Sequence, residues 1–483
     1  MIRPTRTRLT PQPARFRILF LLVLSLLAAR PTMSQPLPQT NDNVDGYRGI
    51  WFTLGQFGPY GDKYSGGLGT YTANHIPMAI HSPESGKTFF VYGGATGTGD
   101  RQLVVMASWY DHTQHRVPQP TVVHVSPGVD DPHDNPSLTI DSDGYLWIFV
   151  SGRSTRRAGI IYRSSAPYST DHFERIREDE FTYPQPWWTD NGLLHLFTRY
   201  SNGRELYLER SPDGRTWEEP RKVAGIGGHY QVSSWNDGVL GTFFNRHPNG
   251  NVDRRTDLYY IQSRDGGQSW TTADGTTVDL PLAEEDHPAR IRNLSANGRL
   301  QYTLDLNWDR NGHPLLLYVT SGSHEAGPSS EPRFWELSRW IGSEWVHSVV
   351  ARSDHNYDLG SLFVLEDRWV VVGPTGTGPQ AWGTGGELER WESRDQGATW
   401  EKKRQITVNS EFNHTYVRRP LHASDPFSLY WADGNPDEIS PSRLYFGELS
   451  GERYWQLPYE MDGPYATPVE YESPEPRPGS NTP

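Results

Sequence analysis

The stretch Ser263-Arg-Asp265-Gly266-Gly-Gln-Ser269-Trp270 recurs in variant form as Ser211-Pro-Asp213-Gly214-Arg-Thr216-Trp217 and Ser393-Arg-Asp395-Gln-Gly397-Ala-Thr399-Trp400. The three copies share the Asp-box pattern S-x-D-x-G-x-[ST]-W. In such a turn the Asp carboxylate accepts backbone N–H groups, Gly adopts a positive φ, and Trp packs beneath a hairpin. The motif is structural, so we assign no catalysis to its Asp residues. Three copies predict the blades of a β-propeller.

Thirteen further segments show the alternating or short apolar patterns that are typical of β-strands. Gly, Asp, Asn and Pro separate them at intervals of about 8 to 15 residues, and no amphipathic helical stretch stands out. The predicted strands are Thr88–Tyr92, Leu103–Trp109, Tyr145–Ser151, Gly159–Arg163, Leu193–Tyr200, Glu205–Ser211, Val239–Asn245, Asp257–Ser263, Pro314–Thr320, Phe334–Trp340, Trp369–Val372, Glu387–Ser393 and Arg443–Glu448.

The length of the chain limits the number of blades. A four-stranded blade takes about 40 to 60 residues, so a body of this size holds about seven to ten blades. The 53 residues between Trp217 and Trp270 favour seven long blades. We therefore predict an all-β fold, a seven-bladed β-propeller with Asp-box turns, in a single domain that covers residues 44–472.

The N-terminus has the features of a processing signal. Five Arg residues precede the apolar run Ile18–Ala29, which Ser25 alone interrupts. This pattern predicts a signal peptide at residues 1–34 and a linker at 35–43. A retained anchor is the alternative, although a membrane span needs about 20 apolar residues. We expect a secreted or periplasmic protein with no membrane span in its mature form. Residues 473–483 are predicted to be a disordered tail.

Composition and charge exclude several classes of protein. The chain has 483 residues and no Cys, which excludes a disulfide scaffold, a thiolate metal site and a Cys nucleophile. Aromatic residues make up 12%, too many for a disordered chain. The net charge of −13 argues against nonspecific binding of nucleic acid, and an anionic substrate would need a local basic pocket. We expect a monomer.

Seven segments place polar residues beside Gly and Pro breaks: 46–56, 63–71, 131–138, 227–233, 243–247, 355–358 and 413–420. Five stretches in these regions resemble one family: the run from Gly46 to Tyr71, His133-x-Asn135-Pro-Ser-Leu, Gly228-His-Tyr-Gln-Val-Ser233, His355-Asn-Tyr-Asp358 and Asn413-His-Thr-Tyr-Val-Arg-Arg-Pro420. The family is the bacterial neuraminidase-repeat (BNR) proteins that include the seven-bladed ulvan lyases of polysaccharide lyase families 24 and 25. The resemblance covers nearly all of the mature chain. It implies a lyase that cleaves a sulfated, uronate-containing polysaccharide by β-elimination.

The resemblance also implies catalytic roles for three residues: His133, Tyr230 lying 97 residues later, and Arg246 a further 16 on. They look like the family's catalytic His, its Tyr, and the Arg that neutralises the uronate carboxylate. A guanidinium on that carboxylate stabilises the enolate-like transition state. Neutral His133 can then take the C5 proton, and Tyr230 can protonate the departing O4. Each residue also has a structural alternative, in a turn, in packing or in an ion pair.

One position departs from the family pattern. The second active-site His of family 24 falls near Ser154 here, in a stretch from Ser151 to Arg157 that holds three Arg. This puts the division of catalytic labour in doubt, and the Arg cluster is a candidate to contact sulfate or carboxylate groups. The residues predicted to bind substrate are Arg153, Arg199, Arg204, His229 and Asn245.

A metal site and two other functions stay open. His324, His355 and Asp358 have the N and O donors that a structural Zn or Ca ion could use, and no cofactor is expected for catalysis. A sialidase-type glycoside hydrolase needs three Arg on one carboxylate, a Tyr–Glu pair and an acidic Asp, and the three Arg cannot be assigned in order. A non-catalytic carbohydrate-binding propeller would explain the missing second His.

Overall fold

The computed structural model describes residues 37–68, 74–97, 102–201 and 203–474. The chain divides into two units, Met1–Leu37 and Pro38–Pro483, and the fold described below is that of the second unit. The predicted signal peptide, the start of the linker and most of the predicted tail lie outside the described residues.

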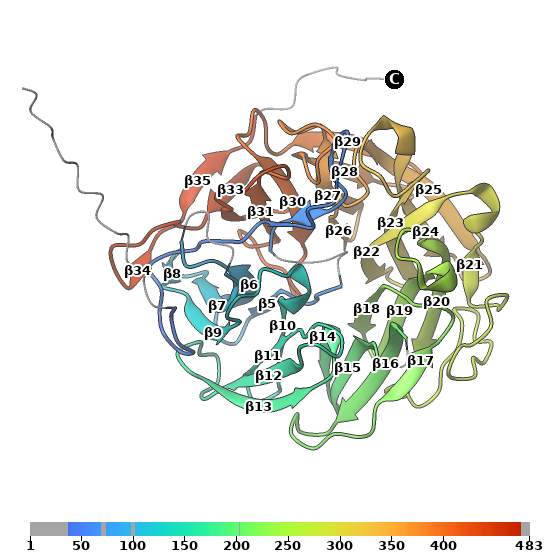
Figure 1. Ribbon diagram of the computed structural model, residues 1–483, viewed down its shortest axis with the longest axis horizontal. Helices are drawn as coiled ribbons and strands as arrows, with labels where there is room; N and C mark the ends of the chain where they lie inside the picture. The colour runs from blue at the N-terminus through green and yellow to red at the C-terminus, as the bar shows by residue number, and fades with distance from the viewer. Residues whose placement is uncertain (1–36, 69–73, 98–101, 202, 475–483) are drawn as a thin grey trace, which may run out of the picture. The chain divides into compact units, whose positions relative to one another are not determined.

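Seven antiparallel sheets of consecutive strands surround a common axis (Figure 1), which confirms the seven-bladed β-propeller. Numbered in chain order, blade 1 contains β5 (Ala79–Ser82), β6 (Lys87–Gly94), β7 (Val104–Asp111) and β9 (Thr121–Val125). Blade 2 contains β10 (Pro136–Ile140), β11 (Leu146–Val150), β12 (Gly159–Ser164) and β13 (Phe173–Asp179). Blade 3 contains β14 (Thr182–Thr189), β15 (Gly192–Arg199), β16 (Glu205–Ser211) and β17 (Arg221–Ala224). Blade 4 contains β18 (Gln231–Asn236), β19 (Val239–Arg246), β20 (Thr256–Ser263) and β21 (Arg290–Arg292).

The remaining blades follow the same pattern. Blade 5 contains β22 (Leu300–Trp308), β23 (Pro314–Ser321), β24 (Arg333–Trp340) and β25 (Trp345–Ser353). Blade 6 contains β26 (Ser361–Val364), β27 (Trp369–Gly376), β28 (Glu387–Ser393) and β29 (Glu401–Gln405). Blade 7 contains β30 (Asn413–Arg418), β31 (Leu429–Gly434), β32 (Leu444–Gly447), β33 (Arg453–Gln456) and β35 (Val469–Glu472).

Short elements decorate the blades. Three two-stranded pairings join β1 (Phe52–Thr53) to β4 (Ser65–Gly66), β2 (Phe57–Gly58) to β3 (Gly61–Asp62), and β8 (Val117–Pro118) to β34 (Tyr465–Ala466). The described helices are 3-10 turns: η1 (Pro132–Asp134), η2 (Pro248–Gly250), η3 (Ser295–Asn297) and η4 (Pro328–Ser330). Within the described ranges, no helix has the length and hydropathy that a membrane crossing requires.

The second and third strands of each blade carry most of the core. Strands β20 and β23 are buried along their whole length, whereas the outermost strand β35 is exposed throughout. All thirteen predicted strands are confirmed, and each is a second or third strand of its blade. The inner and outer strands were not predicted.

The Asp-box turns join the third and fourth strands of blades 3, 4 and 6. Asp265 Oδ1 accepts the backbone N–H groups of Gln268 at 3.0 Å and Ser269 at 2.9 Å. Trp270 is buried, and its Nε1 donates to the Gly267 carbonyl at 3.2 Å. Asp213 and Asp395 accept equivalent backbone N–H groups. These are the hydrogen bonds that the repeated motif predicts.

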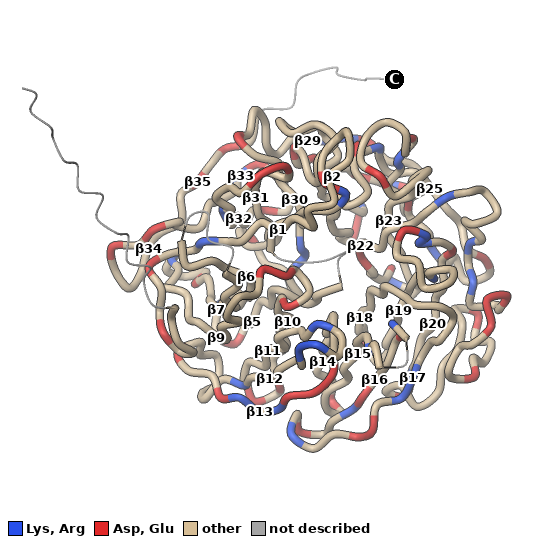
Figure 2. Tube along the Cα trace, viewed as in Figure 1, with Lys and Arg blue, Asp and Glu red and all other residues tan. Residues whose placement is uncertain are grey.

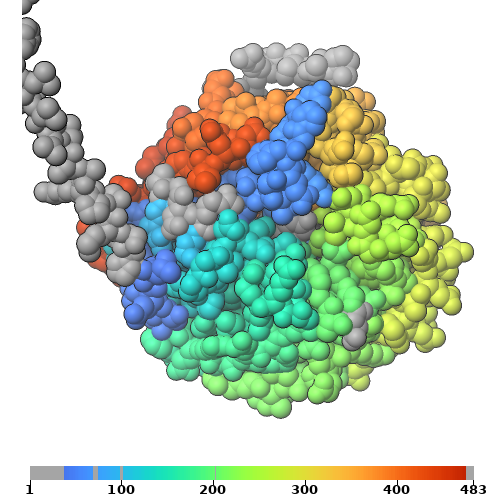
Figure 3. Space-filling model, in the orientation of Figure 1, coloured from blue at the N-terminus to red at the C-terminus, as the bar shows by residue number. Residues whose placement is uncertain are grey.

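The antiparallel order of a blade sorts its connections to two ends of the propeller. Turns between first and second strands, and between third and fourth strands, share the end that we call the 1–2 end. Connections between second and third strands, and the segments that lead into each first strand, share the opposite 2–3 end. The segment with β1 to β4 also lies over the ring between blade 7 and blades 5 and 6 (Figure 3), where Tyr60 meets the ring of Trp382.

The ring closes through a segment that precedes blade 1. On one side the backbone N–H of Gly49 donates to Ser442 O of blade 7 at 2.9 Å, and on the other side that of Ile50 donates to Gly93 O of blade 1 at 3.3 Å. Tyr47 is fully buried between them, and its hydroxyl lies 2.6 Å from both Ser108 Oγ and Pro118 O. This closure connects the two ends of the folded unit.

We expect Tyr47→Phe to lower the free energy of unfolding by about 1 to 2 kcal/mol, because it removes a buried hydrogen-bonding group and leaves its partners unsatisfied. Tyr471→Phe is the matched control, because Tyr471 is 39% exposed and its hydroxyl donates to Gln456 at the surface. Urea unfolding of both variants measures the difference. Equal stability of the two variants would contradict this account of ring closure.

Candidate active site

His133 lies in the turn that leads into the first strand of blade 2, at the 2–3 end. Asp131 caps this turn: its Oδ1 accepts the backbone N–H of His133 at 3.0 Å and also contacts the imidazole Nδ1. Burial lowers the pKa of His133, and the Asp131 carboxylate opposes part of that effect. The imidazole is therefore neutral near pH 7, with Nδ1–H directed to Asp131 and the lone pair on Nε2.

Tyr183 contacts both of the predicted catalytic side chains. Its ring centroid is 5.5 Å from that of His133 and 5.6 Å from that of Tyr230, the second contact being edge-to-face. Tyr183 has a φ of 57°, which is rare for a residue other than glycine. The first strand of blade 3 thus places the Tyr183 ring in contact with both His133 and Tyr230.

Two guanidinium groups lie over the ring of Tyr230. The Cζ atoms of Arg255 and Arg204 are 4.5 Å and 5.3 Å from its centroid, within the range of cation–π attraction. The backbone N–H of Tyr230 donates to Asn245 Oδ1 at 2.7 Å, and the ring meets His247 edge-to-face at 4.9 Å. The side chain that we predicted as the acid is therefore held in an electropositive setting.

Arg255 is the deeper of the two cations. It is 1% exposed, stacks also on the rings of Tyr302 and Tyr357, and donates from Nη2 to the Tyr357 hydroxyl at 2.7 Å. Arg204 is half-buried, and its Nη2 lies 3.3 Å from His247 Nδ1. Arg204, which was predicted to bind substrate, thus lies beside Tyr230. Neither Arg255 nor Tyr183 was predicted, and no spacing in the sequence identified them.

Arg153 adds a third cation beside the aromatic cluster. It lies on the connection between β11 and β12, its Cζ is 5.7 Å from the ring of Tyr200, and its Nε is 3.4 Å from Asp131 Oδ2. Its side chain is 28% exposed. Ser154, where related enzymes were expected to have a second His, occupies the same connection. Arg153, Arg204 and Arg255 therefore surround the Tyr183, Tyr200 and Tyr230 rings.

The structure places Arg246 elsewhere than predicted. The register of β19 shifts between Phe244 and Arg246, so simple alternation does not decide the side that Arg246 takes. Asn245 Oδ1 accepts the backbone N–H of Tyr230, whereas the guanidinium of Arg246 pairs with Glu285 and lies 3.7 Å from Asp257. Its predicted contact with a uronate carboxylate beside Tyr230 does not follow from this geometry.

Two other predicted substrate contacts are engaged in the protein itself. His229 is fully buried; its Nδ1 donates to the Asn245 carbonyl at 2.8 Å, its Nε2 accepts the Ile226 N–H, and burial lowers its pKa to about 4. Arg199 lies 3.4 Å from Asp179 and donates to the Glu180 carbonyl. Asn245 is also buried, and its side-chain oxygen positions Tyr230 by accepting the backbone N–H of that residue. His229, Arg199 and Asn245 therefore have structural contacts within the protein.

The three predicted metal ligands do not form one cluster. His324 Nε2 faces Asp253 at 3.8 Å. His355 Nδ1 accepts from Thr384 at 3.2 Å, and Asp358 uses its two oxygens to accept the backbone N–H groups of His355 and Gly385. Among the residues that the structure describes, no group of three or more His, Asp or Glu side chains is arranged to hold a metal. Each of the three donors has a protein partner instead.

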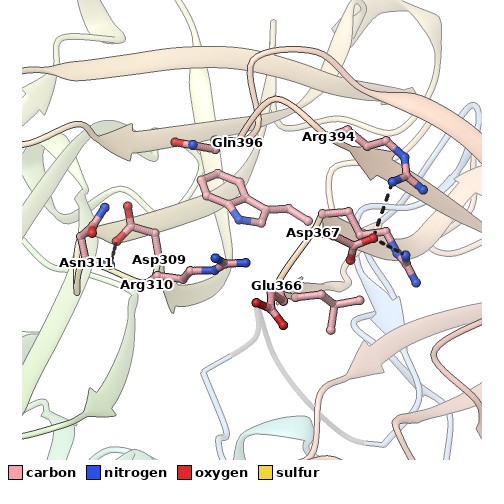
Figure 4. Close-up of a pocket in the computed structure, with 10 residues that line it drawn as sticks. Asp309, Arg310, Asn311, Glu366, Asp367, Arg394 and Gln396 are labelled. Atoms are coloured by element: carbon pink, nitrogen blue, oxygen red, sulfur yellow. Dashed lines mark hydrogen bonds and ion pairs between the residues drawn. The ribbon is translucent and has the colours of Figure 1, made fainter.

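A separate hollow lies at the 1–2 end, between blades 5 and 6 (Figure 4). Among its lining groups, Asp367 contacts Arg368 and Arg394, and Asp309 accepts the backbone N–H of Asn311. It contains none of the predicted site residues. The 2–3 end is therefore the end at which the candidate chemistry gathers.

The fold and this cluster define a propeller with an electropositive, aromatic site at one end. A family model described as "BNR repeat-containing family member" matches residues 87–359, more than half of the chain, and the chain belongs to that family. This confirms the family resemblance that the sequence motifs indicated.

Curated relatives and solved structures point in the same direction. The chain is 24% identical to an ulvan lyase of Nonlabens ulvanivorans over 57% of its own length, and 23% identical to the ulvan lyase PL25 of Pseudoalteromonas sp. (strain PLSV) over 45%. It spans 65% and 52% of those two proteins. A solved PL25 ulvan lyase superposes with a TM-score of 0.67 at 17% identity, covering 84% of this chain and 96% of that one. The same kind of enzyme bound to -[GlcA(1-4)Rha3S]- gives 0.64 at 16% identity, covering 85% and 96%.

Proposed function

We propose that this protein is an exported polysaccharide lyase that cleaves a uronate-containing, sulfated polymer by β-elimination. One observation carries the proposal: the rings of His133 and Tyr230 both contact that of Tyr183, while two guanidinium groups lie over Tyr230. The named relatives support the same class of reaction. The apolar N-terminal run supports export.

The first requirement of β-elimination is to stabilise charge on the uronate carboxylate as C5 loses its proton. Arg204 and Arg153 are the partly exposed guanidinium groups nearest the aromatic cluster. We assign to Arg204, assisted by Arg153, the role that the sequence had suggested for Arg246. A fixed guanidinium fork binds a carboxylate with two parallel hydrogen bonds, and such a contact contributes about 3 to 4 kcal/mol when it strengthens in the transition state.

The second requirement is a base that is unprotonated near neutral pH. His133 meets it because burial lowers its pKa. Asp131 orients the ring by accepting from Nδ1, so Nε2 carries the lone pair that takes the C5 proton. Asp131 also stabilises the imidazolium that forms. Its presence two residues before His133 was visible in the sequence, although its role was not predicted.

The third requirement is an acid for the departing O4 oxygen. Tyr230 has a hydroxyl proton to give, and the Arg204 and Arg255 charges stabilise the phenolate that remains. The reaction then balances: the C5–H and C4–O4 bonds break, a C4=C5 double bond forms, His133 gains one proton and Tyr230 loses one. Exchange of protons with water restores both groups.

We expect His133→Ala and Tyr230→Phe each to lower kcat by about 100-fold or more, because each removes a group that transfers a proton. The measurement is the absorbance of the unsaturated uronyl product formed from ulvan and from other uronate polymers. Tyr230→Phe keeps the ring that packs under Arg255, so its circular dichroism spectrum should match that of the parent. Full activity of both variants, or no unsaturated product from the parent on any uronate polymer, would refute the proposal.

Arg204→Gln and Arg246→Gln form a matched pair that locates the carboxylate contact. We expect Arg204→Gln to lower kcat/KM by about tenfold or more, because it removes a charge beside Tyr230. Arg246→Gln should retain most of the activity, because its partners are Glu285 and Asp257. Steady-state kinetics on one polymer decides between them. The reverse order of effects would restore the role first predicted for Arg246.

The pH profile tests the pairing of His133 with Asp131. Because His133 must be neutral to act as a base and its pKa is lowered, activity should persist below pH 6.5 and decline only as pH falls through that lowered pKa. Asp131→Asn removes the carboxylate that favours the imidazolium, so the acidic limb of kcat/KM should move to still lower pH, with a smaller maximum rate. A limb that moves upward would contradict the assignment.

A further inference from the structure

The connection between β11 and β12 is a tight turn that concentrates positive charge. Residues 153, 156 and 157 are all Arg, and the backbone N–H of Arg153 donates to the Arg157 carbonyl at 2.9 Å while that of Arg156 donates to the Arg153 carbonyl at 3.1 Å. A Cβ at Gly152 would lie 2.4 Å from the Arg157 carbonyl oxygen, so only glycine allows this close return of the backbone. The turn therefore has a defined shape.

Two buried or half-buried acids fix the base of this turn. Arg157 donates from Nε to Asp134 at 2.9 Å and from Nη2 to Asp131 at 3.0 Å. Arg153 also pairs with Asp131, at 3.4 Å. The backbone N–H of Ser154 donates to Thr182 Oγ1 at 3.1 Å, which ties the turn to the first strand of blade 3. These contacts hold the turn against the segment that carries His133.

Arg156 is the member of the turn that these acids do not engage. Its side chain is exposed, and among the described residues no carboxylate pairs with its guanidinium. Three guanidinium groups face two carboxylates here, so the turn keeps a positive charge in a chain with 58 acidic and 45 basic residues. In Figure 2 the blue connection between β11 and β12 lies beside β14 on the face that carries the candidate site.

The tight turn limits what Arg156 can reach. The backbone N–H of Arg156 donates to the Arg153 carbonyl at 3.1 Å, a turn geometry that keeps the two Cα atoms within about 7 Å of each other. When a sugar carboxylate lies beside Arg204 and Arg153, Arg156 is therefore close enough to contact an anionic group on the adjoining sugar. A guanidinium fork suits a compact oxyanion such as a sulfate ester.

We propose that Arg156 is a specificity-determining residue that recognises a sulfate ester on the sugar next to the cleaved uronate. The inference rests on the proposed lyase function and adds a second anion-binding point to it. Arg153 and Arg157 hold the turn in place, and Arg156 supplies the free charge. The turn that lacks the expected second His would then serve substrate choice and not proton transfer.

The experiment compares a sulfated uronate polymer with the same polymer after chemical desulfation. For Arg156→Gln we expect KM on the sulfated polymer to rise about two- to tenfold with little change in kcat, and KM on the desulfated polymer to stay at the parent value. Arg215→Gln is the control, because Arg215 is an exposed Arg on an Asp-box turn at the 1–2 end. It should change neither KM.

An equal change on both polymers, or no change on either, would overturn the proposal. A binding experiment separates this outcome from failure of the lyase function. It measures the affinity for the two polymers of the His133→Ala variant and of the double variant that also carries Arg156→Gln. Loss of the preference for the sulfated polymer in the double variant supports the proposal even if no polymer is cleaved. Inorganic sulfate at millimolar concentration is also tested as a competitor. If it competes with polymer binding but the protein has no preference for the sulfated polymer, the site binds only the free anion and the proposal is overturned.

Discussion

Closure of the ring is the constraint on which this propeller depends. Each blade buries its faces against its two neighbours, so a gap between blades 1 and 7 would expose apolar surface on both. Two connections close the ring in the part of the chain that the structure describes. The short strand β34 of the C-terminal segment pairs with β8, which follows the third strand of blade 1. Segment 45–50 adds a second connection by bonding to blade 1 on one side and to blade 7 on the other. Gly46 permits the contact, because a Cβ there would lie 2.2 Å from the Tyr459 carbonyl oxygen.

The closed ring decides where chemistry can be assembled. First strands converge near the axis, so the segments that enter them come together from several blades at the 2–3 end. His133, Tyr183 and Tyr230 each lie at or just before the first strand of blades 2, 3 and 4. The cations come from the neighbouring connections between second and third strands, as Arg153, Arg204 and Arg255 do. Residues far apart in sequence are therefore adjacent because they occupy equivalent positions in successive blades.

The part of the fold that could be predicted from sequence was the part with a simple burial pattern. Second and third strands such as β20 and β23 are buried on both faces and read as apolar runs. First strands carry polar groups that are satisfied near the axis; Gln185 of β14, for example, bonds to Asn74, Gln231 and Ser233. Outer strands such as β13 and β29 are largely exposed and charged. Neither kind has the apolar signal of a core strand, so pattern alone missed both.

The candidate site also has residues that could be predicted from sequence and residues that could not. His133 and Tyr230 could be found because local motifs surround them, and the structure brings them to one aromatic cluster. Arg246 was assigned through the family resemblance, but a resemblance between sequences does not show which acids a side chain pairs with, and here Arg246 pairs with Glu285 and lies 3.7 Å from Asp257. Arg255 and Tyr183 enter the cluster through contacts between blades, for which a single sequence holds no local signal.

Charge placement explains how an acidic chain can present a site for an anionic polymer. The acids nearest His133 do not face the cluster as free charges: Asp131 contacts His133, Arg153 and Arg157, and Asp134 is held by Arg157. Burial opposes ionisation of Asp131, but these partners hold its pKa below the ordinary value. Asp131 therefore stays ionised and orients His133, Arg153 and Arg157. At Asp134 burial prevails and raises the pKa to about 6. The same two carboxylates thus hold His133 and a turn whose remaining charge is positive, at the end of the ring where we propose that the substrate binds.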